Sequence, residues 1–178
     1  MNVIDTLEFV HSESEDDTEV MQLLEGEVFH VTPRKNWAGI QQAGAICPNT
    51  ELAYPSAFGD FPNSYFRQRG CVSLFDYREF PTDEIWQYRN RCHPLRGAEP
   101  GGAGIAILIL HPSIHESLLP WTLWKDEQAW SQRVVPHAEA GCPEPVSCEL
   151  VVKVVFFRRE VDPDCLAARL RKGRATAP

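Results

Sequence analysis

The sequence predicts a single domain of the α+β class. Its 178 residues, 43% of them apolar, suffice for one hydrophobic core and match the usual size of one domain. Residues 105–110 (IAILIL) and 150–157 (LVVKVVFF) are almost wholly apolar, which is typical of strands covered on both faces. Short helices and irregular connections separate the expected strands, and this favours α+β over a doubly wound parallel sheet.

The first 20 residues are predicted to be mobile or loosely docked. Ser, Glu and Asp are concentrated in residues 11–19, a composition typical of segments that lack a core. We therefore expect order to begin near Met21, and a folded domain over residues 21–178.

The first expected strand covers residues 27–32 (EVFHVT), which alternate and are rich in β-formers. A helix is predicted at 35–43, because Trp37 and Ile40 fall at helical spacing and Gly44 supplies the stop. Residues 47–69 contain three prolines and several aromatic residues, and they predict a long ordered loop. Loops of this length inside a compact domain are usually functional.

The rest of the chain predicts three more strands, an extended segment and two more helices. In chain order, these are a strand at 70–75 (GCVSLF), a helix at 82–91, the strand at 105–110 after a Gly-rich turn, an extended segment at 133–140, the strand at 150–157, and a helix from about residue 164.

Charge argues against a general binder of polyanions. The formal net charge is −8, and the basic residues that cluster, residues 169–174, lie in the last ten positions. Binding to a phosphate backbone depends on clustered Lys and Arg that release counterions, so we interpret this tail as a solvated helix end. A narrow basic groove within an acidic protein stays compatible with these numbers.

A cytoplasmic protein is expected. No segment approaches the ~18 apolar residues that span a bilayer, and the acidic first 20 residues do not resemble a signal peptide. The six cysteines are scattered without a CxxC pair, so we expect free thiols and no metal site.

Several common catalytic motifs are absent from the sequence. It has no GxxxxGK[ST] loop, no GxGxxG after a strand, no HExxH and no GxSxG. Nucleotide hydrolysis through a phosphate loop and hydride transfer by a dinucleotide fold are therefore not expected.

His30 and Thr32 form the first candidate site. On a strand they point to the same face, where an imidazole and a hydroxyl could hydrogen-bond one polar ligand. The alternative is an ordinary, partly buried histidine, with Thr32 capping the next helix.

The segment FHVTPRKNWAGIQQAGAICPN resembles the opening of the ADP-ribosyltransferase superfamily, and is most similar to DarT-type enzymes. There a His-x-Thr or His-x-Ser strand leads into a helix that ends I-x-x-x-G, and the strand holds the ribose and amide of the nicotinamide half of NAD. His30, Thr32, Asn36, Ile40 and Gly44 fall on these positions. The resemblance implies a split, mixed or antiparallel sheet and NAD as a substrate.

The second matching segment is RQRGCVSLF at 67–75. The superfamily carries a Ser or Tyr on this strand, against the nicotinamide, so Ser73, Phe75 and Tyr77 are the candidates here. Arg67 or Arg69 could hold the pyrophosphate with its planar guanidinium. The alternative is a solvent-exposed pair of arginines that flanks a core strand.

The third matching segment is VPHAEA at 135–140, followed by a Pro-rich stretch and the last strand. Its glutamate is the catalytic one in DarT-type enzymes, and Glu139 occupies that place. A fixed carboxylate stabilises the positive charge that builds on the ribose as the nicotinamide bond breaks, and it can take a proton from the nucleophile. Glu144 and Glu149 are alternatives, but we favour Glu139 because it is expected on a strand.

The resemblance implies NAD-dependent transfer of ADP-ribose to a protein or nucleic acid, in a bacterial toxin or defence effector that an inhibitory partner protein restrains. One alternative is a degenerate transferase fold that binds a nucleotide or a protein without turnover. Another is a relative that acts on a phosphorylated RNA end. Trp121, Trp124 and Trp130 are either a stacking surface or a cover over the core edge, and His93, His111 and His115 are expected to be structural.

Overall fold

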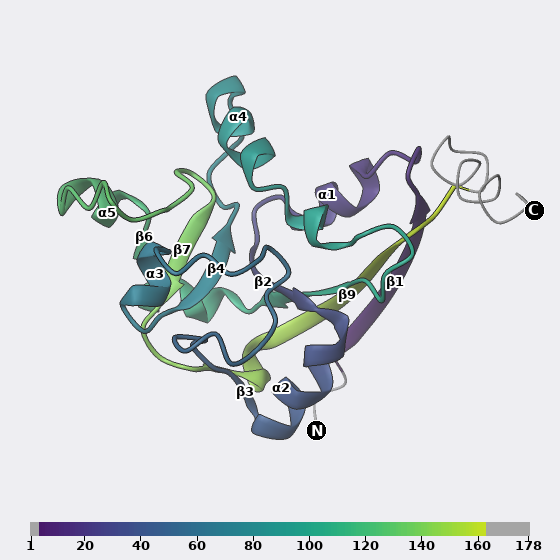
Figure 1. The fold of residues 1–178 in the computed structure, drawn as a ribbon, viewed down its shortest axis with the longest axis horizontal. Helices are drawn as coiled ribbons and strands as arrows, with labels where there is room; N and C mark the ends of the chain where they lie inside the picture. The colour runs from purple at the N-terminus through teal and green to yellow at the C-terminus, as the bar shows by residue number, and fades with distance from the viewer. Residues whose placement is uncertain (1–3, 163–178) are drawn as a thin grey trace, which may run out of the picture.

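A seven-stranded sheet runs through the middle of the computed structural model, which describes residues 4–162 (Figure 1). The strand order is β1-β9-β5-β2-β4-β7-β6, and only β1 and β9 among these neighbours pair in parallel. The strands are β1 (Asp5–Ser12), β2 (Val28–Pro33), β4 (Val72–Asp76), β5 (Ile105–Leu110), β6 (Leu119–Pro120), β7 (Glu139–Cys142) and β9 (Val151–Glu160). A small second sheet pairs β3 (Ala45–Ile46) with β8 (Val146–Ser147).

The α-helices are short and lie around the sheet (Figure 1). They are α1 (Thr18–Leu24), α2 (Trp37–Ala43), α3 (Tyr65–Gln68), α4 (Asp83–Arg91) and α5 (Thr122–Asp126). The Thr82 hydroxyl caps α4 by accepting a hydrogen bond from the Ile85 N–H at 3.3 Å. At the end of α2, Gly44 has φ 73°, the left-handed conformation in which glycine is favoured.

Each face of the sheet has its own hydrophobic core. One contains alternate residues of β2 and β4, such as Phe29 and Phe75, packed with Leu24 of α1. The other contains Leu74 of β4 and is covered by Trp37 of α2. All six residues of β5 are buried, which confirms the prediction of a central strand covered on both faces.

The sheet divides between β2 and β4. These strands pair only at Val28↔Asp76 and Phe29↔Phe75. Beyond that point each strand keeps its other neighbour, since β2 pairs with β5 as far as Pro33 and β4 pairs with β7 as far as Val72. The sheet therefore consists of two well-paired halves joined at one end of the β2–β4 boundary.

The structure confirms a single α+β domain with a mixed, mostly antiparallel sheet. Two internal assignments are corrected. The predicted loop at 47–69 contains helix α3 near its end, and in the predicted extended segment at 133–140 strand structure begins only at Glu139. The helix predicted from residue 164 lies outside the described residues.

The prediction that order begins near Met21 is wrong, because β1 forms an edge strand parallel to β9. Leu7 and Phe9 of β1 alternate along the strand and pack against the core. This alternation was missed in the sequence because the acidic residues that follow the strand dominate the composition of the segment. Those acidic residues are also held in place, since Asp17 forms an ion pair with Arg159 of β9.

Gly141 of β7 is tightly packed, and we expect Gly141→Ala to destabilise the fold. A Cβ at this position would overlap the ring of Phe66, which is 1% exposed and has little room to move. Overpacking of this kind costs about 1–3 kcal/mol, which denaturant unfolding would show as a lower midpoint. Gly39→Ala is the control, because nothing lies within 4 Å of a Cβ there and alanine favours helix α2. Equal midpoints for the two variants would contradict this packing.

Candidate functional site

His30 bridges the two halves of the sheet. It lies on β2 where that strand separates from β4, and its Nδ1–H donates a 3.0 Å hydrogen bond to the backbone carbonyl of Ser73. Burial lowers the pKa of His30 below its usual value of 6.5, and the bond to Ser73 opposes this only in part. The imidazole is therefore neutral near pH 7, and its Nε2 carries a lone pair that can accept a hydrogen bond.

Thr32 and Asn36 lie together at the end of β2. The Asn36 side-chain amide donates to the Thr32 hydroxyl at 2.9 Å and to the carbonyl of Pro55 at 3.0 Å. Thr32 is 5% exposed and does not cap α2. The pair therefore anchors the long loop that follows β3 to the half of the sheet that carries His30.

Ser73 and Phe75 of β4 have different surroundings. Ser73 is exposed beside the divide, whereas Phe75 is 6% exposed and stacks on Phe29 with ring centroids 5.1 Å apart. Phe58 of the long loop also packs against Phe75, with ring centroids 5.4 Å apart. Tyr77 is also buried, at 2% exposure. Of the three candidates on this strand, Ser73 alone is open to a ligand.

The two candidate arginines are also used differently. Arg69 forms an ion pair with Glu127, donates to Gln132 Oε1 at 2.9 Å and lies over the Tyr65 ring at 3.6 Å. These contacts give Arg69 a structural role at α5. Arg67 has a buried Nη2 without a hydrogen-bond partner among residues 4–162. This nitrogen is an unsatisfied donor inside the fold and is not open to solvent.

Glu139 begins β7, at the end of a tight turn. Its carboxylate accepts a 2.6 Å hydrogen bond from the Val135 N–H, and its own N–H donates to the Val135 carbonyl at 3.1 Å. Burial raises the pKa of Glu139 from 4.5 to about 7, although the bond from Val135 favours the ionised form. A carboxyl that titrates near neutral pH is suited to general acid–base chemistry. The two alternative carboxylates, Glu144 and Glu149, are exposed.

The predicted site residues lie on neighbouring strands but do not all face one another. In the pairing register Glu139 is opposite Phe75, which is opposite Phe29, so these side chains share one face of the sheet. His30 follows Phe29 directly and belongs to the other face. The structure thus joins His30 to Ser73 and Thr32 to Asn36, and gives no contact between His30 and Glu139.

A second polar group near Glu139 was not predicted from the sequence. His137 Nδ1 lies 2.7 Å from Glu79 Oε2, and the ring lies against Trp121 and Tyr88, with centroids 4.5 and 5.4 Å away. These partners come from three separate parts of the chain, so no local pattern indicates the contact. The one unusual local feature is the φ of His137, 58°, which a sequence does not reveal.

Trp124 confirms the interpretation as a cover over the core edge, and the stacking surface stays a prediction. Trp124 packs in a small core with Tyr65 and donates to the Gln132 carbonyl at 3.0 Å, whereas Trp130 is 59% exposed. As expected, the histidines outside the site include structural ones, since His93 and His111 accept hydrogen bonds at the starts of short 3-10 helices. Within residues 4–162 the five cysteines are free and no metal-binding cluster occurs; Cys165 lies outside these residues.

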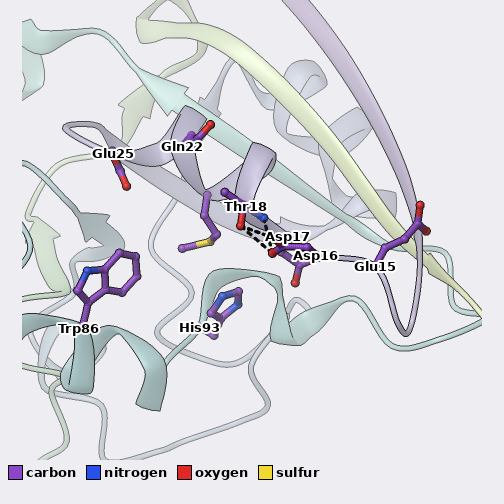
Figure 2. Close-up of a pocket in the computed structure, with 9 residues that line it drawn as sticks. Glu15, Asp16, Asp17, Thr18, Gln22, Glu25, Trp86 and His93 are labelled. Atoms are coloured by element: carbon purple, nitrogen blue, oxygen red, sulfur yellow. Dashed lines mark hydrogen bonds between the residues drawn. The ribbon is translucent and has the colours of Figure 1, made fainter. Parts of the chain in front are cut away.

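A pocket of about 470 Å³ lies between α1 and the segment that runs from α4 to His93 (Figure 2). Trp86 and His93 face α1 across it, and its rim is acidic. Two of the acids already have partners, because Asp17 pairs with Arg159 and Asp16 accepts from the Thr18 hydroxyl at 2.7 Å. A negative rim repels the phosphates of NAD, so this pocket does not fit the predicted substrate.

No protein-family model, curated protein or solved structure matches the chain. None of the helices in the described part of the chain is long and apolar enough to cross a membrane.

The raised pKa of Glu139 predicts a pH-dependent stability difference. A raised folded-state pKa means that the folded state holds the proton more tightly, so this residue's contribution to the free energy of unfolding falls between about pH 4.5 and pH 7. Glu139→Gln removes this pH-dependent decrease in the free energy of unfolding, because the amide side chain does not ionise. We expect the variant to be more stable than wild type by about 1–3 kcal/mol at pH 8 and by little at pH 5, measured by denaturant unfolding. Exposed Glu144→Gln is the control, and equal stabilities of wild type and Glu139→Gln at pH 8 would contradict the buried carboxyl.

Proposed function

We propose that the protein transfers ADP-ribose from NAD to a macromolecular acceptor. The observation that supports this is the arrangement of the three segments that resemble ADP-ribosyltransferases. Although far apart in the sequence, they lie on β2, β4 and β7, three consecutive strands of the sheet. The sheet also divides beside His30, between the first two of these strands.

In this proposal each side chain has a distinct role. The neutral His30 accepts a hydrogen bond from a ribose hydroxyl through Nε2, Ser73 contacts the nicotinamide, and Arg67 binds the pyrophosphate with its guanidinium. Asn36 and Thr32 hold the end of β2 and the loop at Pro55 in position.

Glu139 supports the chemical step. The nucleophile attacks C1′ of the ribose, the bond from C1′ to nicotinamide breaks, and nicotinamide leaves with the electron pair. The ionised Glu139 stabilises the positive charge that develops on the ribose. Because its pKa is about 7, we expect turnover to increase as the pH rises through neutrality.

The second candidate function is binding without turnover. The observation that favours it is the placement of Glu139 and His30 on opposite faces of the sheet, with the Glu139 carboxylate bonded to Val135. In that case the fold holds a nucleotide or a protein and the carboxylate stabilises the turn alone.

Nicotinamide release from NAD distinguishes the two functions. We expect the purified wild type, supplied with cell lysate as a source of acceptors, to release nicotinamide, and Glu139→Gln to release it at least 100-fold more slowly. General acid–base and electrostatic groups typically contribute effects of about this size.

Glu144→Gln and Glu149→Gln are matched controls, because they remove the competing carboxylates from exposed positions and should keep wild-type rates. Wild type that binds NAD without releasing nicotinamide would establish the binding module instead. Wild type that neither binds nor cleaves NAD would contradict both functions.

A further inference from the structure

The pocket between α1 and the segment from α4 to His93 has an excess of negative charge (Figure 2). Four carboxylates line it, and Asp17 alone among them forms an ion pair with an arginine or lysine within residues 4–162, namely with Arg159 of β9. His93 adds no positive charge, because burial lowers its pKa below the usual value of 6.5 and keeps the imidazole neutral at pH 7. The three carboxylates without such a partner belong to Glu15, Asp16 and Glu25.

Two of these carboxylates are held in their ionised form. The Ser12 N–H donates to the Glu15 carboxylate, and the Thr18 hydroxyl and N–H donate to Asp16 at 2.7 and 3.0 Å. These hydrogen bonds lower the pKa of both carboxyls below their usual values, so both are charged at neutral pH. A neutral donor orients a carboxylate but leaves its charge in place. The pocket therefore attracts a cationic group.

The pocket also has walls that suit a cation on an apolar stem. Trp86 faces α1 across it, and Met21 of α1 lines it as well (Figure 2). An indole ring attracts a guanidinium or an ammonium group, and the methylene groups of Arg and Lys cover apolar surface while their charge stays near water. The volume, about 470 Å³, lies within the roughly 300–1,000 Å³ of binding pockets. Arg and Lys side chains of a polypeptide fit both the charge and the walls.

The described chain ends beside this pocket. β9 runs parallel to β1, and its last residue is paired with Ser12. The Ser12 carbonyl accepts a 3.3 Å hydrogen bond from the N–H of Glu15, which belongs to the pocket lining. Arg159 of β9 reaches Asp17 in the same lining. The chain beyond residue 162 thus continues from a point next to the pocket.

The sequence beyond residue 162 carries the complementary charge. Its single acidic residue is Asp164, and its basic residues are Arg169, Arg171, Lys172 and Arg174. Residues 163–168 precede the basic ones, and a chain of this length spans about 9 Å as a helix or about 20 Å when extended. Either length suffices to reach a lining that the Arg159 side chain already contacts.

We propose that this pocket is the docking site of the chain's own basic C-terminal segment, residues 169–174. Its Arg and Lys side chains pair with Glu15, Asp16 and Glu25 and lie against Trp86. Single ion pairs at a surface are weak, but a segment attached next to its docking site acts at an effective concentration on the order of 1 mM. A basic segment of another protein has to compete with this attached one. The contact involves neither NAD nor the candidate catalytic residues, so it stands or falls independently of the proposed function.

Carbodiimide cross-linking of the full-length chain tests the contact, because this reagent joins a carboxylate to a lysine that touches it. Lys172 is the only lysine of the segment. At low salt we expect mass spectrometry to find Lys172 joined to Glu15, Asp16 or Glu25 of the same chain. The yield should fall at least about 5-fold in about 1 M NaCl, where the Debye length is about 3 Å. Lys125, exposed on α5, is the internal control and should give no such product.

Trypsin provides a second measurement, because it cleaves after the same basic residues when they are undocked. In the variant Glu15→Gln/Asp16→Asn/Glu25→Gln we expect cleavage within the segment to be at least about 10-fold faster than in wild type, and the cross-link to be lost. All three positions are exposed, so the core stays intact. The matched control removes three exposed carboxylates elsewhere and should keep wild-type behaviour: Glu116→Gln/Glu144→Gln/Glu149→Gln.

Three results would overturn the inference. One is equal cleavage of wild type and the pocket variant at low salt. Another is a wild-type Lys172 that cross-links only to carboxylates outside the pocket, or to none. The third is a cross-link that forms only between two chains and increases with protein concentration, which would assign the pocket to a second copy. Nicotinamide release is measured separately, and none of these results bears on it.

Discussion

The incomplete pairing of β2 with β4 determines the geometry of the candidate site. β2 is bonded along its length to the buried strand β5, so its position cannot adapt to β4 without exposing apolar residues of the core. The two strands meet at Phe29 and Phe75, whose rings stack at 5.1 Å, and then separate. In place of ladder hydrogen bonds, His30 donates through its side chain to the Ser73 carbonyl. The proposed function depends on this hydrogen bond, in which a side chain takes the place of the backbone pairing between the two strands.

Burial shifts the pKa values of the two titratable groups of the site in opposite directions, and both shifts favour the neutral form. The pKa of His30 is lowered and that of Glu139 is raised, in each case because burial disfavours the charged state. Near pH 7 the histidine is uncharged, whereas the glutamate is partly ionised. A neutral imidazole can accept a hydrogen bond from a sugar hydroxyl, and a carboxylate near its titration point can exchange a proton at little cost.

The sequence predicted most elements because their signals are local. The apolar run that forms β5, the helix expected at 82–91 and the stop at Gly44 each depend on adjacent residues, and the structure confirms all three. Glu139 was also correctly expected on a strand. The N-terminal strand was missed because its stability comes from β9, at the other end of the described chain, while the charges that follow it dominate the local composition.

The site itself was less predictable than the fold. Patterns along the chain selected His30 and Glu139 as candidates, but strand register, which depends on the pairing of distant segments, places them on opposite faces. Arg69 has the residue type expected for a phosphate contact, but its guanidinium is already paired with Glu127 and hydrogen-bonded to Gln132. The contact of His137 with Glu79 joins positions 58 residues apart, and only the folded chain reveals it.

The long loop after β3 contacts both halves of the sheet beside the divide. Its Pro55 carbonyl is bonded to Asn36, on the half of the sheet that contains β2, and its Phe58 ring lies on Phe75 of the other half. The loop therefore crosses from one half to the other over the point where β2 and β4 separate. Glu139 lies on β7 opposite Phe75, at the end where β2 and β4 are still paired, so strand β4 lies between Glu139 and the divide.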